Sequence, residues 1–208
     1  MLTELLHQRR SVRRYLDKVP PKAFLKDVVR CGQSAPSPSN SQPVRVRHIA
    51  SIDTRTALKK ALMNERDVLL ENLAADNGPK RVRNYIRVYY RFSEFMFTAP
   101  WLLLVGTTQV SPGFKDHMVI AGLRTNDNDP QTDQDITVGL FVSAMLLRAT
   151  ELGLASCVLT APLVFLAERN DLSVFNGITP KCFVTLGYGA ETPLSPLRLG
   201  LDQIMETC

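Results

Sequence analysis

The feature that most constrains the fold is a short apolar run, Trp101 to Thr108 (WLLLVGTT), which is followed by polar and turn residues. A run that is apolar at almost every position is typical of a β-strand buried on both faces, because a half-buried strand would alternate apolar and polar residues. The sequence therefore predicts a sheet whose central strand is covered on both sides.

Further helices and strands are expected before and after this strand in the sequence. Apolar residues at helical spacing or apolar–polar alternation identify most of them. Asp53 is expected to cap the third helix, and 110–134 is expected to be irregular. Helices and strands are interspersed, with too few strands for a doubly wound fold. We expect helices at 3–9, from Pro21, at 53–74, 80–97 and 135–152 and from Pro162, and further strands at 44–52, 155–159 and 181–188.

Length and composition indicate an ordinary globular chain. With 208 residues, of which 45% are hydrophobic and 22% charged, one domain over 1–208 is expected. No segment is both long and apolar enough to span a membrane. The four cysteines include no C-x-x-C pair, which argues against a zinc ribbon or redox dithiol. These features predict a soluble protein of the reducing cytoplasm.

The charge is distributed unevenly along the chain. Residues 1–100 carry 19 Lys and Arg against 9 Asp and Glu, whereas residues 101–208 carry 6 against 11. A basic half of this kind favours an anionic partner, which leaves nucleic acid, a membrane surface or a phosphorylated ligand as candidates.

The sequence patterns of several common binding and catalytic sites are absent. Gly187-Tyr188-Gly189 has no third glycine, and no phosphate-binding G-x-x-x-x-G-K or G-x-S-x-G motif occurs. The three histidines are too scattered for a zinc site. Asp127-Asn128-Asp129 resembles the start of a calcium loop, but the glycine and the bidentate glutamate of such a loop are missing. The chain offers few side chains for difficult chemistry, so either a binding function or a bound cofactor is favoured.

The segment RRSVRRY, from Arg9 to Tyr15, concentrates four arginines and one serine. In an extended conformation, alternate residues Arg9, Ser11 and Arg13 project to one side, whereas in a helix Arg9, Arg10, Arg13 and Arg14 share a face. Several guanidinium groups and a hydroxyl that converge on one point suit a phosphate. A solvated basic surface would have the same composition, so the segment alone leaves both interpretations open.

The order of four motifs resembles the FMN-dependent nitroreductase family over nearly the whole chain. RRSVRRY is followed by APSPSNSQP, then by a long apolar helix that leads into ELGLASC, and finally by LGYGAETPLSPLRLGLDQI. The usual pattern of the family differs at some positions, where Val44 replaces a tryptophan, Ala155 a glycine, Gly189 a proline and Pro196 a lysine. These departures indicate a divergent member.

The resemblance implies a set of flavin-binding residues. Its first motif holds the ribityl phosphate, its second reaches the flavin from the other subunit, its third passes the flavin edge, and a late basic residue adds a phosphate contact. In this chain these groups correspond, in order, to Arg9, Arg10, Ser11 and Arg13; Pro36, Ser37, Pro38 and Asn40; Leu159, Thr160 and Ala161; and Arg198.

The resemblance also implies fold, assembly and activity. It implies an α+β nitroreductase fold with a central mixed sheet of four or five strands covered by helices, in an intertwined homodimer. The implied activity is ping-pong electron transfer from NADH or NADPH through FMN to a small electron-poor acceptor, such as a nitroaromatic or a quinone, without a catalytic side chain. Membrane and nucleic acid are not implied partners.

Other functions remain open at this point. The same fold supports dehalogenation of iodotyrosine and breakdown of the flavin itself, and a flavin can be bound without turnover. A basic nucleic-acid-binding protein is the alternative from another class. The stripe Arg83, Arg87 and Arg91 on the helix 80–97 suits nucleic acid or a membrane surface, whereas the family favours a pocket wall or dimer contact for this helix.

Overall fold

A computed structural model describes residues 2–123, 131–166 and 172–207. The possible calcium segment at 127–129 therefore lies outside the described residues. The helices are α1 Leu2–Gln8, α2 Lys22–Gln33, α3 Ile52–Ala75, α4 Lys80–Ser93, α5 Phe114–Ile120 and α6 Gln131–Glu151. Short 3-10 turns are η1 Pro38–Asn40, η2 Glu94–Phe97, η3 Ala161–Phe165, η4 Ser173–Phe175 and η5 Leu201–Gln203. The strands are β1 Val44–His48, β2 Trp101–Thr107, β3 Ala155–Leu159 and β4 Thr179–Gly187.

The described strands form one four-stranded sheet in the order β1-β2-β4-β3. All three neighbouring pairs are antiparallel. A parallel pairing is added by an isolated bridge between Ser11 and Ser156, which places the arginine-rich segment along the edge strand β3. The expected α+β class and the expected four or five strands are confirmed.

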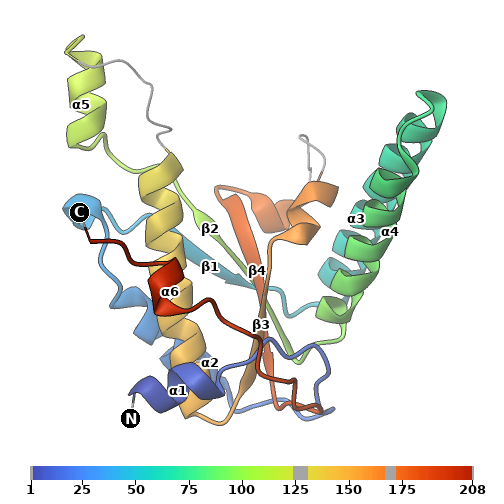
Figure 1. Cartoon of the computed structure of the whole chain (residues 1–208), viewed down its shortest axis with the longest axis horizontal. Coiled ribbons are helices and arrows are strands. Elements are labelled where there is room, and N and C mark those ends of the chain that lie inside the picture. Colours follow the sequence, from blue (N-terminus) through green and yellow to red (C-terminus); the bar gives the residue numbers. More distant parts are fainter. Residues whose placement is uncertain (1, 124–130, 167–171, 208) are drawn as a thin grey trace.

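The central strand β2 is fully buried, as its apolar run predicts. Leu103 and Val105 belong to a core with α2 and α6 on one face of the sheet. Leu102 and Leu104 belong to a second core, with α3, α4 and η3, on the other face. Figure 1 shows α2 and α6 on one side of the sheet and the α3–α4 pair on the other.

A bulge in the sheet brings two backbones unusually close. The register between β2 and β4 shifts at Val105/Gly106. A Cβ atom at Gly106 would lie 2.2 Å from the carbonyl oxygen of Thr179, so a larger residue cannot be accommodated without moving the backbone. Glycine is therefore required here by the close approach of two strands.

Some expected boundaries were wrong. Ser51, not Asp53, caps α3, because its hydroxyl accepts a hydrogen bond from the N–H of Thr54 at 3.4 Å. The predicted irregular segment 110–134 contains α5 and the start of α6. Polar residues at the start of α6 hide its beginning, since they carry no apolar period. Among the described residues, no helix is long and apolar enough to cross a membrane.

Candidate functional site

The arginine-rich segment is extended and is hydrogen-bonded on both sides. The N–H of Val12 donates to Ser156 O at 2.9 Å, and the N–H of Leu16 donates to Tyr188 O at 2.8 Å. The N–H of Ala190 donates back to Arg14 O at 2.8 Å. The segment thus lies between the edge strand β3 and the chain that leaves β4, and it is held there by its backbone.

A half-buried tyrosine, Tyr15, anchors the end of this segment. The hydroxyl of Tyr15 lies 2.7 Å from Thr185 Oγ1 and donates to Val12 O at 2.9 Å. Burial raises the pKa of Tyr15, so the hydroxyl stays protonated at any physiological pH. Val12 is buried below the segment, whereas Ser11 and Arg13 remain exposed. The alternation expected for an extended conformation is therefore present over Ser11 to Arg13.

Three side chains of the first motif lie near one thiol of β3. Burial raises the pKa of Cys157, while Arg13, the Ser11 hydroxyl and Arg9 act in the opposite direction on the same pKa. The bridge between Ser11 and Ser156 places this motif beside β3. The exposed Ser11 and Arg13 and the half-buried Arg9 supply two cations and a hydroxyl, a donor set that suits a phosphate.

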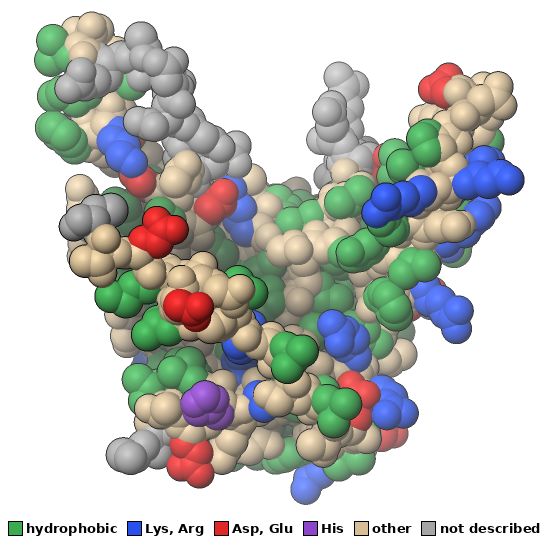
Figure 2. Space-filling model, viewed as in Figure 1, with side chains coloured by type: hydrophobic (Ala, Val, Ile, Leu, Met, Phe, Trp, Pro, Cys, Tyr) green, Lys and Arg blue, Asp and Glu red, His purple; other side chains and the backbone are tan. Residues whose placement is uncertain are grey.

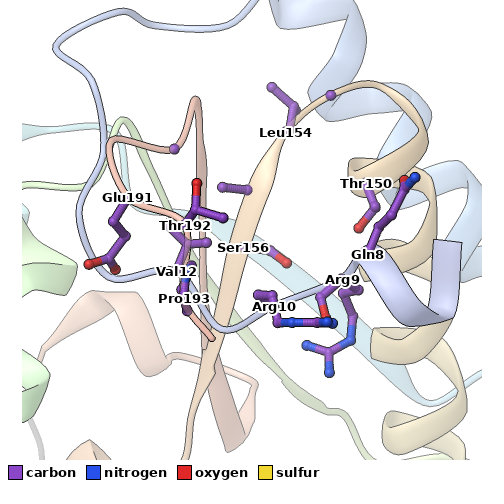
Figure 3. A pocket seen from close by; sticks show the side chains of 13 residues that line it. Gln8, Arg9, Arg10, Val12, Thr150, Leu154, Ser156, Glu191, Thr192 and Pro193 are labelled. Carbon is purple, nitrogen blue, oxygen red and sulfur yellow. The ribbon is translucent and has the colours of Figure 1, made fainter. Parts of the chain in front are cut away.

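A pocket of about 250 Å³ lies beside this segment, between α1, the end of α6, the start of β3 and the loop after β4. Figure 3 shows Arg9 and Arg10 on one side of it, with Gln8 and Thr150 close to each other. The guanidinium of Arg10 is hydrogen-bonded to His7 O and to Arg9 O. Of the twelve predicted site residues, only Arg9 and Arg10 line this pocket.

The second motif has an unusual backbone. Ser39, Asn40 and Gln42 all have positive φ values, of 50°, 53° and 46°. The N–H of Gln42 donates to Ser37 Oγ at 3.0 Å, and the Gln42 side-chain amide donates to Asn40 Oδ1 at 3.1 Å. These bonds make the Pro- and Ser-rich stretch an ordered loop, as its place between α2 and β1 predicts. Non-glycine residues with positive φ are uncommon and often mark functional loops.

One chain does not bring the first and second motifs together. Figure 1 shows η1 with its light blue loop at the left edge of the molecule and α1 at the bottom, near different ends of α6. Pro36, Pro38 and Asn40 are exposed and Ser37 is half-buried. A ligand that contacts both motifs therefore needs the second motif of another chain.

The third motif lies where β3 ends and η3 begins. Leu159 is buried, Thr160 is exposed and Ala161 is half-buried. The carbonyl of Thr160 accepts the N–H of Leu163 at 3.0 Å. Arg198 lies in an exposed tail, which also carries six large apolar side chains that are each at least 61% exposed: Leu194, Leu197, Leu199, Leu201, Ile204 and Met205.

Two residues, Glu191 and Ser156, contact the segment in ways that the sequence did not indicate. The carboxylate of Glu191 accepts hydrogen bonds from the backbone N–H groups of Arg13 and Arg14. Ser156, whose carbonyl accepts from Val12, is buried and lines the pocket. Both residues lie within the family stretches ELGLASC and LGYGAETPLSPLRLGLDQI, but the resemblance assigns neither of them a role, so only the folded chain identifies their contacts.

The helix pair α3–α4 projects from the sheet as an arm (Figure 1, right). One flank of α4 carries four exposed residues at helical spacing, Val82, Tyr85, Tyr89 and Phe92, which we call the aromatic flank. Arg87 and Arg91 are exposed on another flank, whereas Arg83 is half-buried. Figure 2 shows hydrophobic and basic side chains along this arm. The basic stripe and the aromatic residues thus belong to separate surfaces of one helix.

The comparisons with known proteins agree on one fold. A model of the nitroreductase family matches residues 6–188. A BluB-like flavoprotein from Clostridium difficile 630 is 18% identical with a TM-score of 0.81, covering 100% of this chain and 99% of that one. An iodotyrosine deiodinase bound to FMN and 3-iodo-L-tyrosine is 20% identical with a TM-score of 0.67, covering 97% and 96%. An FMN- and NADPH-dependent nitroreductase, NfnB from Sphigopyxis sp. strain HMH, is 18% identical with a TM-score of 0.67, covering 100% and 99%.

Proposed function

The chain belongs to the nitroreductase family, and we propose that it is an FMN-dependent oxidoreductase that takes electrons from NADH or NADPH and passes them to a small electron-poor acceptor. The observation that carries this proposal is the extended arginine-rich segment, which is hydrogen-bonded along β3 with Ser11 and Arg13 exposed. A nitroaromatic or a quinone is the proposed class of acceptor. The named activities of the similar structures belong to those proteins, and they support the general chemistry only.

The donor set fits the phosphate of FMN. A phosphate monoester carries a charge of roughly −1.5 to −2 at neutral pH and offers three strong acceptor oxygens. Arg9, Ser11 and Arg13 supply two guanidinium groups and a hydroxyl, and we propose Arg10 and Arg198 as further cations at this site. When bound, FMN supplies the two-electron chemistry that the side chains lack.

We propose that the flavin site is shared between two chains of a homodimer. The positions of the first and second motifs at different ends of α6 support this (Figure 1). The exposed tail around Arg198 supports it too, because large apolar side chains on a surface favour a contact with another chain. In such a dimer Pro36, Ser37, Pro38 and Asn40 of one chain would complete the site of its partner.

The protein's own part in the reaction would be to bind FMN and to orient it. The arginines and Ser11 would hold the phosphate end of FMN, and Leu159, Thr160 and Ala161 would border its ring system. No side chain is assigned as acid or base. Exclusion of water by the partner chain strengthens each charge–charge interaction inside the site.

The compartment that we propose is the cytoplasm. The three cysteines that the structure describes, Cys31, Cys157 and Cys182, are all free. Free thiols are typical of proteins in a reducing compartment.

The experiment that tests the function is anaerobic reduction, followed in the visible spectrum of the purified protein after incubation with FMN. We expect flavin absorption that bleaches when NADH or NADPH is added and returns when a quinone is added. A bound flavin that neither nucleotide bleaches would indicate another flavin chemistry, or binding without turnover. Absence of flavin together with salt-dependent affinity for DNA or RNA would favour the nucleic-acid alternative.

A further inference from the structure

Glu191 connects the phosphate-binding segment to the loop after β4. Its Oε1 accepts the backbone N–H of Arg13 at 2.6 Å and that of Arg14 at 3.1 Å. Its Oε2 accepts Arg14 Nε at 2.8 Å. One carboxylate thus joins two consecutive N–H groups and one guanidinium, and the Glu191 side chain is 20% exposed.

These contacts lie at the point where the segment needs support. Val12 and Leu16 donate to neighbouring backbone, but the N–H groups of Arg13 and Arg14 have Glu191 as their partner. The same carboxylate pairs with the Arg14 guanidinium, whereas the Arg13 side chain is exposed. Figure 3 shows the Glu191 carboxylate directed away from Arg9 and Arg10.

We propose that Glu191 is a positioning residue that fixes the backbone of Arg13 and Arg14 and so directs the Ser11 and Arg13 side chains at the phosphate of FMN. This inference rests on the proposed function. It assigns Arg14 to the Glu191 contact and excludes it from the phosphate site. It also implies that the two N–H groups serve the carboxylate and do not bind the phosphate.

Simple electrostatics predicts the opposite effect for loss of Glu191. A carboxylate near a phosphate site repels the phosphate, so its removal should tighten FMN binding if Glu191 acts only through its charge. If Glu191 positions the segment, its removal should weaken FMN binding because the donor set loses its geometry. The sign of the change therefore distinguishes the two roles.

The experiment compares Glu191→Ala, Glu191→Gln and the control Glu71→Ala, which removes a carboxylate from the exposed side of α3. Dissociation constants for FMN and riboflavin are measured by fluorescence quenching. Amide hydrogen exchange of flavin-free protein is measured by NMR at Arg13 and Arg14, with Val12, Leu16 and β2 as internal references.

We expect Glu191→Ala to weaken FMN binding about tenfold, the size of one charge-assisted hydrogen bond, and to leave riboflavin binding unchanged. Exchange should accelerate at Arg13 and Arg14 and stay unchanged at the reference amides. Glu191→Gln keeps one acceptor oxygen and should have a smaller effect. Glu71→Ala should match the wild type.

Tighter or unchanged FMN binding in Glu191→Ala would overturn the inference. So would equal weakening of FMN and riboflavin, which indicates a general loss of structure, or unchanged exchange at Arg13 and Arg14. Wild-type protein that binds neither flavin would reject the proposed function and the phosphate role together. Failure of the wild type to bind either flavin is distinguishable from the other outcomes, because those all begin from a wild type that binds FMN.

Discussion

Arg13 and Arg14 are neighbours in the sequence with different surroundings. Arg13 is exposed, and its charge opposes the rise that burial causes in the pKa of the Cys157 thiol. Arg14 is paired with Glu191. We predict that Arg13→Ala weakens FMN binding by roughly 1.5–3 kcal/mol, the range for hydrogen bonds to charged groups. Turnover should recover in excess FMN, because the phosphate is remote from the reacting part of the flavin.

Arg14→Ala is the matched control for this prediction. The Arg14 side chain is 75% exposed, and a surface ion pair contributes little, so a smaller loss of affinity is expected. Both variants are titrated with FMN by fluorescence quenching. A costly Arg14→Ala together with a neutral Arg13→Ala would show that the first motif is assigned in the wrong register.

Arg55 has a structural role that its position in α3 does not reveal. Its guanidinium donates to four backbone carbonyls, those of Ile49, Phe97, Ala99 and Pro100, at 2.6–3.2 Å. Burial lowers the pKa of this arginine. These hydrogen bonds connect the start of α3, at the base of the α3–α4 arm, to the segment that leads into β2.

We predict that Arg55→Met lowers the free energy of unfolding by at least about 2 kcal/mol, because half-buried carbonyls lose a charged donor. Chemical denaturation in urea measures the change. Lys60→Met, on the exposed side of the same helix, should stay within about 0.5 kcal/mol of the wild type. Equal stability of the two variants would contradict the role assigned to Arg55.

At the scale of elements, the aromatic flank of α4 is exposed. Two of its ring contacts lie within the helix: the ring centroids of Tyr85 and Tyr89 lie 6.3 Å apart, edge to face, and Arg81 lies over the Tyr85 ring at 5.3 Å. We propose that this flank borders the acceptor site of a partner chain. Phe92→Ala should then raise the KM for an aromatic acceptor about two- to tenfold, the size of one aromatic contact, and leave the affinity for FMN unchanged.

Steady-state kinetics with a quinone tests this, with Arg87→Ala as a control on another flank of the same helix. An unchanged KM in Phe92→Ala would remove the aromatic flank from the acceptor site. If Arg87→Ala instead abolishes binding to nucleic acid, the basic stripe has a separate function.

The predictability of the elements follows from their local patterns. The buried strand β2 and the amphipathic α2 were evident because apolar residues recur at a fixed period. The start of α6 and the short α5 were missed, since polar and turn-forming residues occur there without such a period. The contacts of Arg55 and Glu191 were also missed, because they join residues that are far apart in the sequence.

For the site, too, local sequence motifs could be recognised, whereas long-range contacts could not. The twelve residues of the family motifs could be proposed from the sequence, because each motif is a continuous stretch. Their arrangement was not, because it depends on how the segment 9–16 is held between β3 and the loop after β4. Whether a second chain completes the site is a property of the assembly.

At the scale of the whole molecule, the exposed side of α6 is the surface we assign to the dimer. Ile136 and Leu140 are 57% and 44% exposed on neighbouring turns of this long helix. We predict a mass of about twice 23.2 kDa in light scattering, with no folded monomer on dilution. Leu140→Arg should give a monomer or an unfolded chain with little FMN, because a charge would be buried in the contact.

Met63→Arg, at an exposed apolar position of α3, controls for the added charge and should leave the dimer intact. A folded Leu140→Arg monomer that keeps full affinity for FMN would contradict the shared site.

The phosphate assignment, on which this account depends, is tested most directly by parallel titration with FMN and with riboflavin, which lacks the phosphate. The account predicts that FMN binds more tightly, and that its advantage shrinks as salt screens the arginines. Equal affinity for the two flavins at low and at high salt would contradict it.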